Sequence, residues 1–476
     1  MKVTRREATR RILGLTAWGI PTVIPRTVWG ANEQIRVGVI GLGGRGLGAH
    51  IPGFQNQPNV EVVAVSDPDP ARLTQAVNWF QNRYGRTVDA YPDMRRLLDR
   101  DDIDCIANAT QNYWHGVSTI WACRAGKHVY VEKPLSHYIW EGRKMVEVAR
   151  ACNRIVQVGT QRRSQTSIRQ MIGWLRQGNL GAIRYVLAFA NKPRKSCGKR
   201  TTPLPLPPGL DYDLWCGPAP MLPVYRDRLQ YDCSFDWITG DGESCNQGVH
   251  EVDVARWCLG EPGLPRRVLS IGGRFVFDDA CNTPNTQIIY YEYPSAPILY
   301  LVHNLPESKG SDRMPTVRGE GVGVIVECEE GWASLYRGVA FDREGREVVR
   351  FSGNEDHFAN FIEAVRAQDP AKLTADVEEG HISTAVCHLG NISYRVGRRA
   401  SVAEQQAAIA GLPYFEELHD RFLAHLAAHE VDPNTAILGE FLEVDSEREC
   451  VVNHPAANRI VRGWYRKPYV TPELET

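Results

Sequence analysis

The sequence predicts an α/β protein in which a doubly wound parallel sheet is followed by an α+β domain with a large open, mostly antiparallel sheet. A buried-strand pattern at residues 35–40 runs directly into a glycine-rich segment at 41–46. Strand-like runs then alternate with helix-like runs up to residue 134, an order typical of a doubly wound fold. Residues 267–351 are rich in strand-like segments, which predicts the second sheet.

The composition is that of a globular chain with more than one domain. The 476 residues are 43% hydrophobic and 23% charged, and a chain of this length exceeds what a single hydrophobic core normally serves. The 55 Lys and Arg against 56 Asp and Glu leave a net charge of −1. This balance offers no broad basic surface to a nucleic acid or an anionic membrane.

The individual elements follow from the pattern in order. In the first domain we expect strands at 35–40, 60–65, 104–109 and 128–134, and helices at 47–55, 70–84, 93–99 and 116–125. Beyond it we expect a strand at 182–191 and helices at 165–177, 357–367, 377–398, 402–410 and 415–429.

The first thirty residues have the layout of an export signal. Arginine pairs at 5–6 and 10–11 precede an apolar stretch that is too short to span a membrane. Small residues near position 30 permit cleavage before Ala31. Residues 4–6 (Thr-Arg-Arg) resemble the start of a twin-arginine signal, a route that exports folded proteins. We expect a periplasmic or otherwise exported protein; a disordered basic tail on a cytoplasmic protein is the alternative.

The glycine-rich segment after the first strand predicts a dinucleotide site. It reads Gly41-Leu42-Gly43-Gly44-Arg45-Gly46, between a strand and a helix. In this pattern glycines allow a tight turn, a close approach of backbone N–H groups to a pyrophosphate, and close helix packing. Asp67 follows the second strand, where an acid accepts the ribose hydroxyls of NAD and repels the 2′-phosphate of NADP. We expect NAD as the cofactor, while Arg72 keeps NADP open as the lesser alternative.

Polar residues follow the next parallel strands, at the sheet edge where such folds bind ligands. Thr110, Gln111 and His115 come after the strand at 104–109, and Glu132 and Lys133 lie at the end of the strand at 128–134. We expect these residues to face the nicotinamide end of the cofactor.

These patterns divide the chain into four predicted segments. They are a twin-arginine signal peptide at 1–30, an NAD(P)-binding Rossmann domain at 33–157, an α+β substrate and oligomerisation domain at 158–411, and an extension at 412–476 packed on the core.

Twelve cysteines are spread along the chain without CxxC spacing, so zinc and thioredoxin-like sites lack their motifs. Their apolar surroundings indicate small buried residues that stay unpaired, in a chain folded in a reducing compartment. We expect no bound metal.

Five stretches occur in the order of a known family. They are VGVIGLGGRG, IANATQNYWH, AGKHVYVEKPLS, VQVGTQRR and NQGVHEVDVARW. With them the chain resembles the Gfo/Idh/MocA oxidoreductases, such as glucose-fructose oxidoreductase and inositol dehydrogenase, over about residues 33–410. The resemblance implies an NAD(P)-binding domain, a second domain whose open sheet receives a sugar or cyclitol, and a homo-oligomer, dimer or tetramer, packed through the sheets.

Three residues form the predicted catalytic set. The resemblance assigns Lys133, in the Glu-Lys-Pro element, to the active site, where burial lowers a lysine pKa and lets it donate or accept a proton. His250 starts a helix-like segment, and a helix N-terminus favours the neutral imidazole that can take a hydroxyl proton. Related dehydrogenases have an aspartate four residues earlier; here it is Asn246, which can hydrogen-bond a hydroxyl but cannot hold a proton.

Five further residues are candidates for substrate contact, with a structural role as the alternative for each. Arg162 follows the strand at 155–158, Trp114 follows the third strand, Asp236 and Trp237 lie in an irregular loop, and Asp253 lies one turn after His250 and could orient it. Among the tryptophans, we expect Trp114 and Trp237 to face sugar.

Together these observations predict an oxidoreductase that acts on a sugar or cyclitol hydroxyl with a tightly bound NAD(P). Free NAD is not expected to be regenerated outside the cytoplasm, so an exported cofactor must be recycled in place. One alternative is a redox-neutral glycoside hydrolase, in which oxidation at C3 acidifies the C2 proton, the C1 substituent leaves, water adds and the hydride returns. A non-catalytic cofactor- or sugar-binding protein is the other. We expect a small carbohydrate ligand, no nucleic acid partner and no membrane span.

Overall fold

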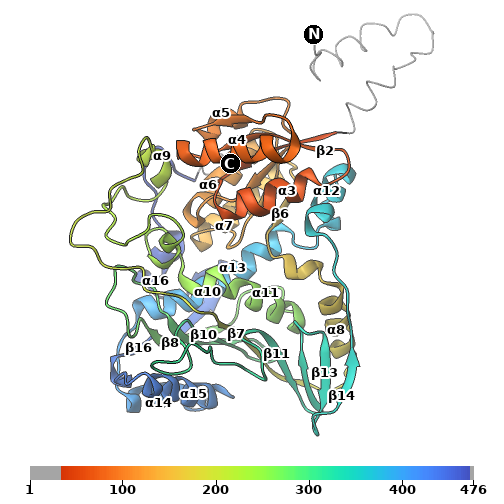
Figure 1. The fold of residues 1–476 in the computed structure, drawn as a ribbon. Helices are drawn as coiled ribbons and strands as arrows, with labels where there is room; N and C mark the ends of the chain where they lie inside the picture. The colour runs from red at the N-terminus through yellow and green to blue at the C-terminus, as the bar shows by residue number, and fades with distance from the viewer. Residues whose placement is uncertain (1–33, 472–476) are drawn as a thin grey trace, which may run out of the picture.

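A computed structural model describes residues 34–471, so the predicted signal peptide and its cleavage point lie outside the described residues. Figure 1 shows a helix-covered sheet at the top of the view and a second, broader sheet at the bottom. None of the helices in this described range has the length and apolar character needed to cross a bilayer.

The N-terminal domain is built on a six-stranded parallel sheet with the strand order β3-β2-β1-β4-β5-β6. The strands are β1 (Ile35–Ile40), β2 (Val60–Ser66), β3 (Asp89–Tyr91), β4 (Cys105–Asn108), β5 (His128–Val131) and β6 (Val156–Val158). The helices are α3 (Ile51–Gln55), α4 (Pro70–Tyr84), α5 (Met94–Leu98), α6 (Asn112–Arg124) and α7 (Ile139–Ala151). Helices cover both faces of the sheet, which explains why its strands are continuously apolar. The strand order is that of a Rossmann sheet.

The second domain is built on a twelve-stranded mixed sheet whose main path is β14-β13-β12-β11-β7-β10-β9-β8-β16-β15. Only β7 and β10 pair in parallel among the strand pairs described in this sheet. Its strands are β7 (Ile183–Asn191), β8 (Arg267–Gly273), β9 (Thr286–Glu292), β10 (Ile298–His303), β11 (Val322–Cys328), β12 (Gly331–Ser334), β13 (Val339–Asp342), β14 (Glu347–Arg350), β15 (Arg398–Arg399), β16 (Ile437–Leu438), β17 (Leu442–Asp445) and β18 (Cys450–Val451). The predicted fold class is therefore confirmed.

Helices cover both faces of the central strands of this sheet. The upper face packs against α11 (Gly248–Leu259) and α13 (Val377–Val396), and the lower face packs against α14 (Val402–Ile409) and α15 (Phe415–Ala428). The remaining helices are α8 (Thr166–Arg176), α9 (Tyr212–Cys216), α10 (Gly242–Asn246), α12 (His357–Ala367) and α16 (Pro455–Arg462). The sheet floor is thus less open than the sequence predicted, because the chain's own helices bury both sides of its centre.

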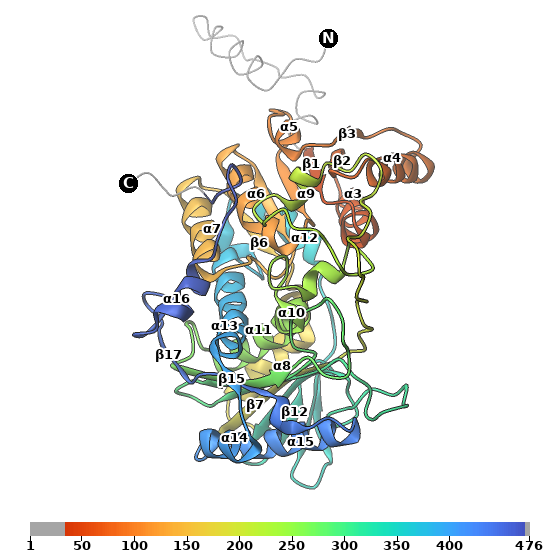
Figure 2. The same cartoon turned by 90° about the vertical axis from the view of Figure 1, so that its left-hand side faces the viewer.

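The chain crosses the predicted domain boundaries twice. Helix α12 packs Phe361 against Phe54, inside the core of the N-terminal domain, because its apolar stripe completes the cover of β1 and β2. Near the C-terminus β16 and β17 extend the second sheet beside β8, and Tyr469 packs against Trp114. Figure 2 shows this last segment running up beside α7. Residues after 411 thus pack against both the second sheet and the N-terminal domain.

The prediction that all cysteines stay unpaired is wrong. Cys197 and Cys281 form a disulfide between the loop after β7 and the loop after β8. The other ten cysteines are free and mostly buried. The two partners are 84 residues apart, so no local pattern pointed to the pair.

Candidate active site

The glycine loop leaves open space where a pyrophosphate would approach. A Cβ on Gly41, which has a φ of +83°, would lie 2.5 Å from the carbonyl oxygen of Ala109, and one on Gly46 would lie 1.9 Å from the Gly41 oxygen. A Cβ on Gly43 would meet only Arg72 Nη1, 4.0 Å away, and one on Gly44 would meet nothing within 4 Å. The outer glycines are therefore required by packing, while the middle ones border a free cradle that fits a dinucleotide.

Asp67 closes one side of this cradle. Its Oδ2 accepts a hydrogen bond from the backbone N–H of Leu42 at 2.8 Å, and its Oδ1 accepts one from Asp69 N–H at 3.0 Å. Burial raises the pKa of Asp67 from its usual value. Arg72 lies on the same side, with Nη1 3.5 Å from the Leu42 oxygen. The structure thus brings the predicted ribose-binding acid against the predicted phosphate loop.

Glu132 ties the glycine loop to the end of β5. Its Oε1 accepts from Arg45 Nε at 2.6 Å and lies 2.9 Å from His50 Nε2. Burial alone would raise the pKa of Glu132, but His50 and Arg45 hold it well below its usual value. This carboxylate is engaged within the protein, so it positions Arg45 beside the cofactor cradle.

His115 does not reach the cofactor space, and that prediction is wrong. Helix α6 begins at Asn112 rather than at 116, so its first turn turns His115 inward. The buried ring lies between the carbonyl oxygens of Pro134, 2.7 Å from Nδ1, and Thr110, 3.0 Å from Nε2. His115 therefore joins the two strand-end loops that carry the predicted site. Gln111 extends from one of them and donates to Gln230 Oε1 at 3.1 Å.

The three predicted catalytic residues meet beside this edge. Lys133 Nζ donates to the carbonyl oxygen of Asn246 at 2.5 Å, and Asn246 ends α10 just before α11 begins. His250 lies in the first turn of α11, which packs tightly on the sheet because a Cβ on Gly248 would lie 1.9 Å from Tyr300 Oη. Burial, then the charge of Lys133, lowers the pKa of His250 well below its usual value. Burial also lowers the pKa of Lys133. The arrangement offers a neutral imidazole next to a lysine, suited to moving a hydroxyl proton.

Known proteins match both the sequence of this first domain and the overall fold. Residues 35–160 match the Gfo/Idh/MocA model, described as an oxidoreductase family with an NAD-binding Rossmann fold. The N-terminal domain belongs to the Gfo/Idh/MocA oxidoreductase family. The cofactor domain, with its glycine loop and its Glu-Lys-Pro element, is the part that carries the match.

The chain is similar to two kinds of known protein: glycosyl hydrolases by sequence and sugar dehydrogenases by fold. Glycosyl hydrolase family 109 protein 2 from Shewanella sp. (strain ANA-3) is 33% identical over 156 residues, which cover 32% of this chain and 31% of that protein. Myo-inositol dehydrogenase from Lactobacillus casei, solved with NAD(H) and myo-inositol, shares the fold at 20% identity and a TM-score of 0.53, covering 76% of this chain and 95% of its own. The WlbA dehydrogenase from Bordetella pertussis, solved with NADH and UDP-GlcNAcA, does so at 19% identity and a TM-score of 0.56, covering 76% and 96%.

Two of the predicted substrate contacts are wrong because the side chains are buried. Trp114 is 2% exposed, packs against Trp121 and Tyr469, and donates its indole N–H to the Leu214 oxygen. Asp253 is fully buried and binds the guanidinium of Arg163. Both serve packing between segments, which their sequence positions did not reveal.

The other three residues predicted to contact the substrate lie in different parts of the structure. Arg162 is half-buried, and its positive charge helps to lower the pKa of His250, which places it near the predicted catalytic set. Asp236 accepts from Asn282 Nδ2 at 3.1 Å and holds its own loop. Trp237 lines a small pocket with His137, Tyr138 and Arg395, none of which belongs to the predicted catalytic set.

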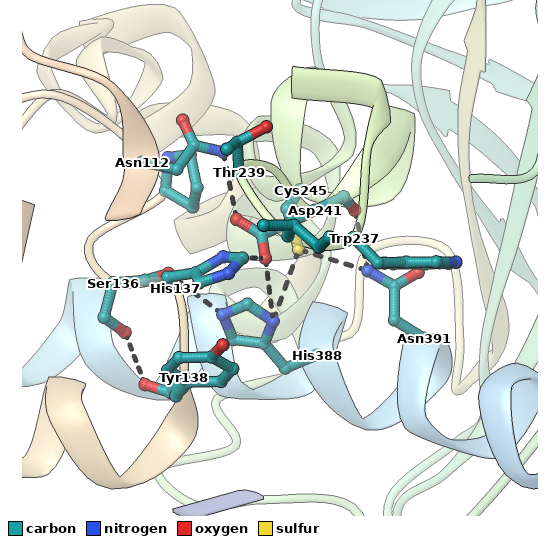
Figure 3. Close-up of polar contacts among 12 residues, drawn as sticks. Asn112, Ser136, His137, Tyr138, Trp237, Thr239, Asp241, Cys245, His388 and Asn391 are labelled. Atoms are coloured by element: carbon teal, nitrogen blue, oxygen red, sulfur yellow. Dashed lines mark hydrogen bonds and ion pairs between the residues drawn. The ribbon is translucent and has the colours of Figure 1, made fainter. Parts of the chain in front are cut away.

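That pocket borders a buried polar network that holds α10 in place (Figure 3). Asp241, at the start of α10, binds His137 Nδ1 at 2.7 Å and Asn112 Nδ2 at 2.9 Å. Its backbone oxygen accepts from Asn391 Nδ2 at 2.7 Å, and His388 Nε2 lies 3.0 Å from the Ser136 oxygen. Although burial works against it, Cys245 and Asp241 raise the pKa of His388 to about 9. The network fixes α10 against the segment that follows Lys133.

Sequence analysis missed a second group beside Asn246. Tyr231 is 53% exposed, with its hydroxyl accepting from Asn246 Nδ2 at 3.4 Å. Arg194 lies over the Tyr231 ring at 5.5 Å and pairs with the buried Glu243 through two hydrogen bonds of 2.8 Å. These residues come from three separate segments, so only the fold brings them together. Glu243, one turn before Asn246, is the residue from which sequence could have indicated a polar group here.

Proposed function

We propose that this protein is an NAD-dependent oxidoreductase that acts on a sugar or cyclitol hydroxyl and holds its cofactor tightly. The observation that carries the proposal is the meeting of Lys133, Asn246 and His250 at the carboxyl edge of the Rossmann sheet, next to the free glycine cradle. A protein that only bound a cofactor would not need a neutral histidine and a half-buried lysine together at this edge.

Each residue has a defined part in such a reaction. When bound, NAD(P) supplies the hydride acceptor. His250, kept neutral at physiological pH by burial, takes the proton of the reacting hydroxyl. Lys133 stabilises the oxygen as it gains negative charge. The Asn246 side chain, anchored on Tyr231, hydrogen-bonds a neighbouring hydroxyl.

The position of Asp67 supports NAD as the dinucleotide. Its buried carboxylate stands at the glycine loop, where it favours ribose hydroxyls and repels a 2′-phosphate. Arg72 lies on the same side of the loop as Asp67, and its Nε lies 3.7 Å from an oxygen of Asp69. This engagement supports NAD over NADP.

A redox-neutral glycoside hydrolase is the second candidate. The likeness to glycosyl hydrolase family 109 proteins supports it, as does Asn246, which cannot act as the carboxylate of a simple dehydrogenase relay. On this route the C3 hydroxyl is oxidised, the C2 proton is lost and the C1 substituent leaves; water then adds its hydroxyl to C1 and a proton to C2, and the same hydride returns to C3. The bond between C1 and its substituent is exchanged for one to water, with no net oxidation.

Twin-arginine export with the cofactor already bound is part of the proposal. The Cys197–Cys281 disulfide supports an oxidising destination. A homo-oligomer is also proposed; because α14 and α15 cover the centre of the lower sheet face, its contacts would use other surface.

The test separates the two candidates by isotope and by variant. Turnover of a panel of sugars and glycosides in D2O gives deuterium at C2 if elimination occurs and none if only the hydroxyl is oxidised. Lys133→Ala and His250→Ala are expected to lose about 100-fold or more of turnover, while Lys144→Ala, a half-buried lysine on α7, retains it. Full turnover in both catalytic variants would refute the assignment.

A further inference from the structure

Two half-buried cations near His250 have no carboxylate partner. They are Arg162, just after β6, and Lys192, just after β7. Among residues 34–471, the hydrogen-bonding side chains that contact them are the neutral amides of Gln165 and Gln247. A cation held in a protein interior without a counter-charge is costly, so a site that retains two has a use for them.

Arg162 is fixed in a position that faces the first turn of α11. Its guanidinium lies 4.1 Å from the centre of the Tyr336 ring, and Nη1 donates to Gln165 Oε1 at 3.2 Å. Its positive charge helps to lower the pKa values of both His250 and Glu251. Its neighbour in sequence, Arg163, is instead buried and neutralised by Asp253. The two arginines therefore have different roles.

Lys192 contacts Gln247, the N-cap residue of the same helix. Its Nζ donates to Gln247 Oε1 at 3.0 Å, and the backbone oxygen of Gln247 accepts from His250 N–H at 3.0 Å. An ammonium group carries three donors, so two are left for a ligand.

The acids around the site do not cancel these charges. Glu243 is neutralised by Arg194, and Glu132 by Arg45 and His50. Glu251 is fully buried and bound to Gln247 and Tyr336, and burial raises its pKa to about 7. The region around His250 is therefore electropositive even though the chain as a whole is not.

We infer that the substrate carries an anionic group, and that Arg162 and Lys192 bind it beside the reacting hydroxyl. The inference rests on the proposed function and adds the substrate class, a sugar acid with a carboxylate or phosphate group. Guanidinium and ammonium donors both match the oxygens of such groups, and the half-buried setting strengthens the contact.

The experiment compares sugars that differ only in this charge. Glucose, glucuronic acid and glucose 6-phosphate are titrated into the full-length protein loaded with NADH, with binding followed by NADH fluorescence and turnover by absorbance. We expect one of the two acidic sugars to bind at least about tenfold more tightly than glucose, equal to ~1.4 kcal/mol. This preference should shrink as salt is added. The two acidic sugars distinguish a carboxylate site from a phosphate site.

Variants assign the preference to the two cations. Arg162→Gln and Lys192→Gln are each expected to reduce the ratio of acidic-sugar affinity to glucose affinity about tenfold. Lys144→Gln, a half-buried lysine already paired with Glu147, should keep the wild-type preference. NADH binding and circular dichroism establish that each variant is folded, and if one fails to fold the other decides.

Each outcome bears on either the inference or the function. Equal or weaker binding of both acidic sugars, or a preference that survives in both variants, overturns the inference. Turnover of glucose without any acidic preference leaves the proposed function standing and removes the inference. Selective binding of an acidic sugar, with no hydride transfer to or from any sugar in the panel, keeps the inference and removes the proposed function.

Discussion

Breaking the Cys197–Cys281 disulfide should both destabilise the second domain and loosen one wall of the active site. Phe235 packs against both cysteines, and the Tyr231 ring meets Phe235 edge to face with centroids 6.1 Å apart. Tyr231 in turn bonds Asn246. The disulfide therefore holds Phe235, and through it Tyr231, in place against Asn246.

The size of the stability loss follows from the length of chain that the bond closes. For a separation of 84 residues, loop-closure entropy in the unfolded chain corresponds to roughly 4.5 kcal/mol at about 25 °C. In a cooperative unit of about 150–250 residues, each kcal/mol shifts the melting temperature by about 2–4 °C. We expect a decrease of roughly 10–15 °C.

The assay compares the wild type with a Cys197→Ser/Cys281→Ser double variant. Thiol titration in denaturant should find ten free thiols in the unreduced wild type and twelve after reduction. Thermal unfolding of the double variant should match that of the reduced wild type, while Cys152→Ser, a half-buried free cysteine, remains close to the oxidised wild type. The double variant should also show a raised KM with a smaller change in kcat.

Two results would refute this reasoning. Twelve free thiols in the unreduced protein would show that the bond does not form. A double variant with the melting temperature of the oxidised wild type would show that the bond contributes no stability.

Three further predictions test other parts of the structure. Gly46→Ala should abolish NAD binding, because its Cβ would lie 1.9 Å from the Gly41 oxygen; Gly48→Ala, with open space around it, serves as the control in an NADH fluorescence titration. Burial lowers the pKa values of His303, at the end of β10, and of His425 in α15, the latter to about 4; the two rings stack with their centroids 4.0 Å apart. Below about pH 6.5 the unfolded chain therefore binds more protons than the folded one. The free energy of unfolding should be full above that pH and fall below it by at most about 1.4 kcal/mol per pH unit for each histidine. Melting curves from pH 8 to 5 measure this loss. Protein from the periplasmic fraction should begin at Ala31 by N-terminal sequencing, and finding only the intact N-terminus would exclude that cleavage.

Local sequence was sufficient for the elements and for the cofactor loop. Helices at 70–84 and 357–367 have the bounds that were predicted, since proline or aspartate at their starts and an amphipathic stripe define them. The glycine loop and Asp67 also meet as expected, because their spacing within one βαβ unit fixes their geometry.

Long-range packing accounts for the errors. Trp114 and His115 follow a strand end, where side chains often face a ligand, but α6 begins four residues early and turns both into the interior. Asp253 was read as a possible partner of His250, yet Arg163 from another segment binds it. The contacts among Tyr231, Arg194 and Glu243 could not be predicted, because these residues are far apart in sequence. Each error depends on a partner that no local pattern specifies.

The central claim is that this chain holds a nicotinamide dinucleotide and exchanges hydride with a carbohydrate at Lys133 and His250. The most direct measurement is the near-ultraviolet absorbance of reduced nicotinamide in the purified full-length protein, before and after each sugar of the panel is added. The account predicts about one bound cofactor per chain and a reversible change in that band with at least one sugar, lost in His250→Ala. A protein that neither carries nor takes up NAD(H) would contradict the account.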